Sequence, residues 1–308
     1  MIGSKYSRKT RHERLLRKMA LLITCACAIA GCSTTFTYNQ LDWLIPWHID
    51  DYVDLDRNQN EMLRSKLEQL LRWHRYEELN EYIGTLDRIE QDVQTQVTAG
   101  TVISWIDDIK QAVDRVESTF LKMALELGAT MRDAQINEFR ENLRQSQQDY
   151  EKEYLARDDE EYRKDNYNSL LKNLRRFVGR MNPEQKRHLQ QTANSLLRFD
   201  TKWLADRELW IRKLDSLLQR KPEWQQAVLD AHGSRYRIRS IQYQSVLDHN
   251  MTIISTALAD ILNQLDSKQR KRLIKKIAGL REDLQKLSKP PPRGQMTRKA
   301  PLKQPEDI

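Results

Sequence analysis

The chain has 308 residues, of which 52 are Lys or Arg and 44 are Asp or Glu, so its formal net charge is +8. Hydrophobic residues make up 39% and charged residues 31%, which allows a buried core but excludes a polytopic membrane protein. The 9 Gly and 8 Pro are too few for the turns of an all-β sandwich or barrel. The cysteines Cys25, Cys27 and Cys32 lie too close together for a disulfide framework or a zinc site. Long helices are therefore expected.

The first 31 residues have the layout of a secretory signal peptide. Residues 1–18 contain seven Lys or Arg and one Glu, and the uncharged residues 19–31 follow. This uncharged stretch is too short to span about 30 Å of hydrocarbon as a helix. We therefore expect residues 1–31 to be removed, which leaves a chain of net charge +2 that retains Cys32 alone among the cysteines. With this charge the chain no longer indicates a nucleic-acid partner, and none is expected.

The end of this segment, Ile29-Ala30-Gly31-Cys32, resembles the lipobox of bacterial lipoproteins. The resemblance implies cleavage between Gly31 and Cys32 and acylation of Cys32, and several acyl chains make membrane attachment effectively permanent. In that class, a residue other than Asp directly after the cysteine implies delivery to the outer membrane, and Ser33 stands at this position. We expect a lipid-anchored protein that faces the periplasm. The alternative is an ordinary signal peptide in which Cys32 has no role.

Residues 32–55 form an acidic and aromatic segment that contains no Lys or Arg. Pro46 is expected to prevent a regular helix through its middle. We expect the aromatic side chains, such as Trp43 and Trp47, to dock on the body of the protein while the Asp side chains face solvent.

Residues 56–287 are predicted to be the helical domain. Apolar residues recur there at steps of three and four, as in the stripe Leu273, Ile277, Leu280 and Leu284. Each stripe covers one side of its helix, so the helices must pack on one another. The predicted fold class is all-α, an elongated multi-helix bundle of antiparallel amphipathic helices. Residues 288–308, which hold five of the prolines, are expected to be a disordered basic tail.

A short pattern, an apolar residue followed four positions later by Gln, occurs at residues 55–59, 131–135, 181–185 and 265–269. In three copies Asp56, Asn182 or Asp266 stands at the expected N-cap with Gln three residues later, which is a capping box. Arg132 stands there in the second copy, which leaves its cap in doubt. The pattern resembles the Leu-Thr-x-x-Gln segments of periplasmic chaperones of the Spy and CpxP type. Recurrent helix starts are the favoured explanation, since capping accounts for them without a shared activity.

A second resemblance extends over most of the chain. It is carried by YNQLDWLIPWHIDDYVDLD at residues 38–56, LLRWHRYEEL at 70–79, YEKEYL at 150–155 and GRMNPEQ at 179–185. These segments resemble a family of uncharacterised proteobacterial outer-membrane lipoproteins whose domain has no assigned function. The resemblance implies the cellular address and the helical fold and supplies no activity.

No catalytic residue, metal ligand or cofactor site is predicted. The chain lacks dinucleotide and phosphate-binding loops and the His-Glu-x-x-His and Gly-x-Ser-x-Gly motifs. His74 beside Glu77 and Glu78 could form an acid and base cluster, but an ordinary pairing on a helix surface is favoured. The alternative function is a cell-wall glycan-acting enzyme with a lone Glu such as Glu78 or Glu153.

The C-terminal end is the most informative part for binding. Residues 266–308 carry a net charge of +8, which leaves −6 for residues 32–265. We expect a basic helix face to bind an anionic surface, with solubilisation of an exposed helix as the alternative. The candidate residues are Arg270, Lys271, Lys275, Lys276 and Arg281.

The predicted function is that of a non-enzymatic binding, structural or chaperone-like component of the cell envelope. The expected partners are the membrane, through the lipid anchor, and peptidoglycan, lipopolysaccharide or envelope proteins.

Overall fold

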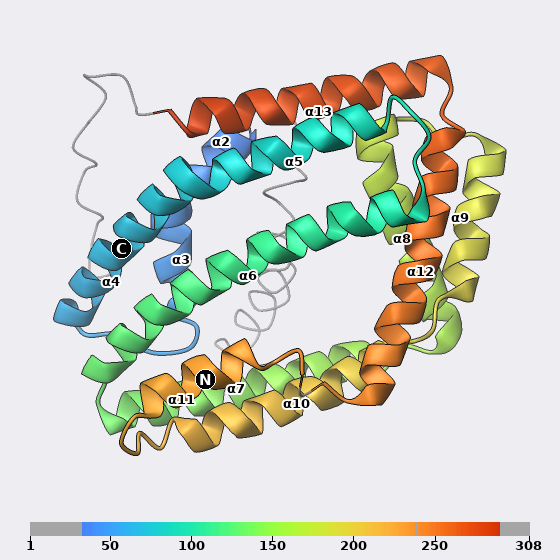
Figure 1. Ribbon diagram of the computed structural model, residues 1–308. Helices are drawn as coiled ribbons and strands as arrows, with labels where there is room; N and C mark the ends of the chain where they lie inside the picture. Colours follow the sequence, from blue (N-terminus) through green and yellow to red (C-terminus); the bar gives the residue numbers. More distant parts are fainter. Residues whose placement is uncertain (1–32, 238, 290–308) are drawn as a thin grey trace, which may run out of the picture.

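The computed structural model describes residues 33–237 and 239–289, and all regular secondary structure within these ranges is helical. The prediction of an all-α, multi-helix fold is confirmed (Figure 1). The predicted signal peptide, Cys32 and residues 290–308 of the predicted tail lie outside the described residues. The helices are α2 (Ser33–Tyr38), α3 (Leu41–Ile49), α4 (Arg57–Trp73), η1 (His74–Glu78), α5 (Leu79–Asp92), α6 (Ala99–Thr130), α7 (Asp133–Tyr154), α8 (Asp159–Val178), α9 (Pro183–Ser195), α10 (Asp200–Leu217), α11 (Trp224–Gly233), α12 (Ile241–Asn263) and α13 (Ser267–Leu287).

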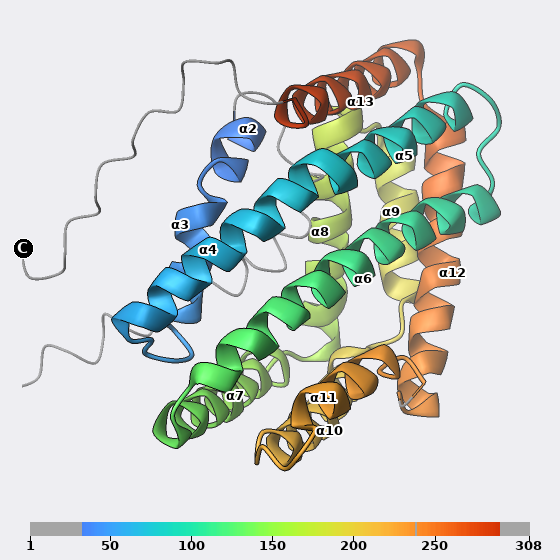
Figure 2. The same ribbon diagram turned by 60° about the vertical axis from the view of Figure 1, so that its left-hand side comes forward.

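The helices form an open frame. The π-helical turn η1 joins α4 and α5 into one long rod, and α6 returns beside this rod (Figure 1). On the other side of α5 lies α13, while α8, α9 and α12 stand side by side at one end of the frame (Figure 2). Along the lower edge of the frame in Figure 1, α7 packs against α10, α11 lies beside α10, and α10 meets α12. Each amphipathic stripe is thereby covered by a helix distant in sequence.

Two main hydrophobic clusters occupy different corners of this frame. The larger cluster joins the facing ends of α5 and α6 to α8, α9, α12 and α13, and Met181, Leu189 and Ile261 are almost fully buried in it. The other cluster joins α4, α6 and the start of α7 around Leu63 and Leu67. Each corner contains the starts of two helices that carry the repeated Gln pattern.

The four repeated Gln side chains meet in two buried pairs. Gln59 and Gln135 exchange two side-chain hydrogen bonds of 3.2 and 2.7 Å, and Gln185 and Gln269 exchange two of 3.0 Å. All four side chains are at most 5% exposed. In such a pair each side-chain amide donates to and accepts from the other, so both amides are hydrogen-bonded without water. The first copy of the pattern pairs with the second and the third pairs with the fourth.

Each pair also connects the ends of other helices. The side-chain amide of Gln59 donates to the Thr130 carbonyl at the end of α6, at 3.0 Å, and that of Gln269 donates to the Arg180 carbonyl after α8, at 2.8 Å. The predicted capping boxes at Asp56, Asn182 and Asp266 are confirmed. The Arg132 side chain makes no cap hydrogen bond and its guanidinium instead donates to Asp56 at 3.1 Å, while the Arg132 backbone N–H donates to the side-chain carbonyl of Gln135 at 3.0 Å. The repeat therefore builds the corners of the frame as well as capping its helices.

The acidic and aromatic segment differs from expectation, because α3 is a helix with Pro46 inside it. Proline removes one donor, and its φ near −65° is compatible with a helix, so a short helix loses only the bond to the Asp42 carbonyl. The helix continues past the proline, where the Asp50 N–H donates to the Pro46 carbonyl at 3.0 Å. The expectation that Pro46 prevents a regular helix was wrong.

Candidate functional site

The five basic residues predicted to bind an anionic surface do not share one face of α13. Arg270 and Arg281 turn towards α5. The Arg270 guanidinium donates to the carbonyl oxygens of Val93 and Leu262, and that of Arg281 pairs with Asp87 at 2.7 Å and with Glu90. These two arginines join α13 to the helix ends and acids beside it, so their charges are compensated within the fold.

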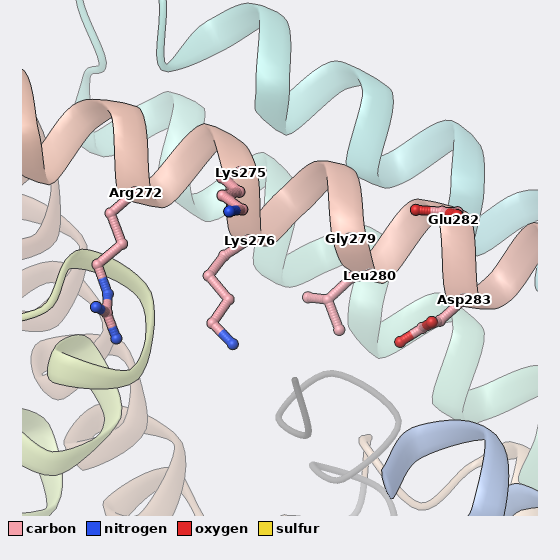
Figure 3. Close-up of a pocket in the computed structure, with 7 residues that line it drawn as sticks. All are labelled: Arg272, Lys275, Lys276, Gly279, Leu280, Glu282 and Asp283. Carbon is pink, nitrogen blue, oxygen red and sulfur yellow. The ribbon is translucent and has the colours of Figure 1, made fainter. Parts of the chain in front are cut away.

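Lys275 and Lys276 lie on the opposite side of α13, together with Arg272. They line one side of a hollow of about 440 Å³, and all its described lining residues belong to α13 (Figure 3). Its lining residues are Arg272, Lys275, Lys276, Gly279, Leu280, Glu282 and Asp283. No hydrogen bond or ion pair to another described residue involves the side chains of the three basic residues, so their charges face the hollow and the solvent. We call this feature the basic hollow.

The basic hollow is electrostatically divided along α13. Arg272, Lys275 and Lys276 occupy one end, where Arg272 and Lys276 extend to the same side of the helix in Figure 3. Glu282 and Asp283 occupy the other end. The hydrogen bond from Lys286 at 2.8 Å lowers the pKa of Glu282 and offsets its charge. The basic end is therefore suited to a phosphate or carboxylate group.

Arg272 was not among the predicted residues, although its spacing from Lys275 and Lys276 indicates that it lies on the same side of the helix. It stands three and four residues before Lys275 and Lys276, which places all three on one side of a helix. Its aliphatic stem lies over Gly179, which has a φ of +84° at the end of α8. A β-carbon on Gly179 would lie 2.9 Å from the Arg272 Cδ, so glycine both allows this turn and leaves room for the arginine. Lys271 is exposed and does not line the basic hollow.

His74 is half-buried and Glu78 is buried, whereas Glu77 is exposed, so the interpretation of this cluster as a helix-surface pairing was wrong for His74 and Glu78. His74 begins η1 and lies between two tyrosine hydroxyls, Tyr38 at 3.0 Å from Nδ1 and Tyr82 at 3.2 Å from Nε2. In a neutral imidazole one nitrogen donates and the other accepts, so both bonds are satisfied. Burial lowers the pKa of His74 to about 4, and burial also raises the pKa of Tyr38 to about 12. This arrangement fixes α2 against the α4 and α5 rod.

Glu78 at the end of η1 is held by Arg115 of α6. The Arg115 guanidinium donates to both carboxylate oxygens, at 2.7 and 2.9 Å, and Glu78 is only 3% exposed. This ion pair joins the rod to α6 and occupies both oxygens that a reaction would need. Glu153, the other carboxylate considered for catalysis, is exposed on α7.

Within residues 33–237 and 239–289, no helix combines the length and the apolar character needed to cross a membrane. No group of three or more His, Cys, Asp or Glu side chains in the same residues is arranged to hold a metal ion.

Comparison with known proteins leaves one informative match. A comparison with curated proteins found no match, and neither did a comparison with solved structures. Residues 51–244, which include η1 and both helices of the first Gln pair, match a family described as a family of unknown function, DUF6279. This match spans more than half of the chain, and the protein is therefore a member of the DUF6279 family.

Proposed function

We propose that this protein is a non-enzymatic binding component of the bacterial cell envelope, anchored by lipid at Cys32 and facing the periplasm at the outer membrane. Its basic hollow binds the anionic groups of an envelope polymer. The observation that carries the proposal is the convergence of Arg272, Lys275 and Lys276 on one hollow, while Arg270 and Arg281 are compensated by α5 and neighbouring carbonyl groups.

The proposed anchor rests on the residues before the described fold. A basic flank, a short apolar stretch and Ile29-Ala30-Gly31-Cys32 have the order of a lipoprotein signal. Cys32 stands immediately before α2, so acylation there would hold the folded body close to the membrane. This position keeps the basic hollow within the periplasm, where phosphate groups of lipopolysaccharide and carboxylates of peptidoglycan are the available polyanions.

Charge removal tests the basic hollow. We expect the triple variant Arg272→Gln, Lys275→Gln, Lys276→Gln to bind purified envelope polymer about tenfold more weakly at low salt, because exposed charge contacts contribute up to about 1 kcal/mol each. Cosedimentation with peptidoglycan sacculi and capture on lipopolysaccharide measure the two sources separately. The difference between variant and wild type should shrink as salt rises, since exposed charges are screened.

The matched control removes three positive charges elsewhere. Lys268→Gln, Lys271→Gln, Lys289→Gln changes the net charge equally, and all three lysines are exposed and outside the basic hollow. Binding by this control should stay close to wild type. Equal loss in both triple variants would show a general charge effect and contradict the role of the hollow.

Substitution of Cys32 tests the anchor. Full-length Cys32→Ser should lack acyl chains and leave the membrane fraction without detergent, since the proposed site of acylation is removed. Fractionation of cells and mass spectrometry of the mature N-terminus measure this result. Cys25→Ser, seven residues earlier, should remain lipidated and attached. Membrane attachment of Cys32→Ser that only detergent releases would contradict the proposed anchor.

A further inference from the structure

Helix α3 is apolar on almost every side and yet contributes no buried residue. Seven of its nine residues are apolar, LDWLIPWHI, and none of the nine is buried. The Trp43 side chain remains 46% exposed, one of the largest apolar exposures in the described residues. A helix that is apolar all round is normally enclosed by protein or lipid, so α3 requires an explanation.

One side of α3 packs on the hydrophobic cluster around α4, through Ile45 and Ile49. Trp43 and Trp47 stack on each other, with ring centroids 6.0 Å apart and planes inclined by 7°. In Figure 2, α2 and α3 lie along the outer edge of α4, on the opposite side of the molecule from α12. The stacked pair is therefore a preformed aromatic surface at the edge of the frame.

The chain itself indicates what meets this surface. Trp43 lies only eleven residues after Cys32, and six of the intervening residues form α2. A helix of that length rises about 9 Å, and the remaining residues reach at most about 3.5 Å each. If Cys32 carries acyl chains, α3 therefore lies within reach of the headgroups of the same bilayer. Tryptophan is the residue most suited to that interface, because its ring is apolar and its N–H is polar.

We propose that α3 lies on the bilayer that holds the anchor, with the exposed Trp43 ring inserted among the lipid headgroups and Trp47 stacked behind it. The charge of this segment indicates which lipid headgroups it can approach. No Lys or Arg occurs from residue 33 to residue 56, and Asp42, Asp50 and Asp54 are exposed on and after α3. An anionic membrane would repel these carboxylates, so α3 binds a zwitterionic surface such as one of phosphatidylcholine or phosphatidylethanolamine.

This inference rests on the proposed attachment at Cys32, so its test supplies the attachment chemically. In the chain from residue 32 to residue 308, Cys32 is the only cysteine, and it can be coupled to maleimide lipid in phosphatidylcholine vesicles. Brominated acyl chains in those vesicles quench tryptophans that enter the bilayer. Of the seven tryptophans in the chain, we expect quenching to arise from Trp43 and from Trp47 only through its stacking on Trp43.

Two variants assign the quenched residues. Trp43→Phe, Trp47→Phe should lose the quenching while keeping the wild-type circular dichroism, and Trp210→Phe on α10 should keep it. Vesicles that contain phosphatidylglycerol should quench less, because of the exposed Asp side chains. Absence of quenching in the tethered wild type, retention of it in the double variant, or stronger quenching by anionic vesicles would overturn the proposal. Because coupling replaces acylation, none of these results depends on whether cells lipidate Cys32.

Discussion

Gln185→Leu is expected to lower the free energy of unfolding by about 3 kcal/mol, because it removes three hydrogen bonds, the two exchanged with Gln269 and the one accepted from the Asn182 N–H. Gln185 is fully buried, and its side-chain carbonyl accepts from Gln269 and from the Asn182 N–H, both at 3.0 Å. Leucine fills much of the same volume but accepts neither bond. Urea denaturation followed by circular dichroism measures the change.

Two comparisons separate the amide pair from a general effect of substitution. Gln190→Leu, on the same helix but exposed, should change stability by no more than about 0.5 kcal/mol. The double variant Gln185→Leu, Gln269→Leu should cost about 1 to 2 kcal/mol less than the sum of its single variants, since both amides are then absent. A cost for Gln185→Leu no larger than that for Gln190→Leu would contradict the structural role of the pair.

The protein should lose roughly 3 kcal/mol of stability between pH 7 and pH 4 through His74 alone. Burial lowers the pKa of His74 from an ordinary value of 6.5 to about 4 in the folded protein. Above pH 6.5 the imidazole is neutral in both states and contributes no pH dependence. Between pH 6.5 and 4 the unfolded chain binds a proton that the folded chain does not, so the free energy of unfolding decreases as the pH is lowered. Below pH 4 both states are protonated, and the loss from this group stops.

His74→Gln isolates this contribution, because glutamine can donate to one tyrosine and accept from the other but does not titrate. Unfolding midpoints between pH 6.5 and 4.5 should depend less on pH in this variant than in the wild type. Gln190→Leu, which changes no titrating group, should keep the wild-type slope. An unchanged slope in His74→Gln would show that His74 titrates normally and that its burial between Tyr38 and Tyr82 is incorrect.

Features that depend on neighbours along the chain could be read directly from residue order. The capping boxes at Asp56, Asn182 and Asp266 join groups three residues apart, so their pattern predicts both the helix and its start. The apolar stripes likewise predict the all-α class, because the helical period repeats every 3.6 residues. Pro46 shows the limit of a single local signal, since a short helix accommodates it.

Features that depend on distant partners could not be read in this way. Gln59 and Gln135 are 76 residues apart, and Gln185 and Gln269 are 84 apart, so a capping pattern does not reveal that they pair. His74 was expected on a surface because its partners Tyr38 and Tyr82 come from two other helices.

The basic hollow could likewise be predicted only in part from the sequence. Composition and helical periodicity determined that α13 is basic and amphipathic, and Lys275 and Lys276 followed from that alone. Only the tertiary structure decided that Arg270 and Arg281 are compensated and that Arg272 joins the hollow, because α5 brings its acids and helix end to one side of α13. A charged side chain is available for binding only where no other part of the fold lies close enough to neutralise it. The distance between such a side chain and a partner on another helix cannot be read from residue order.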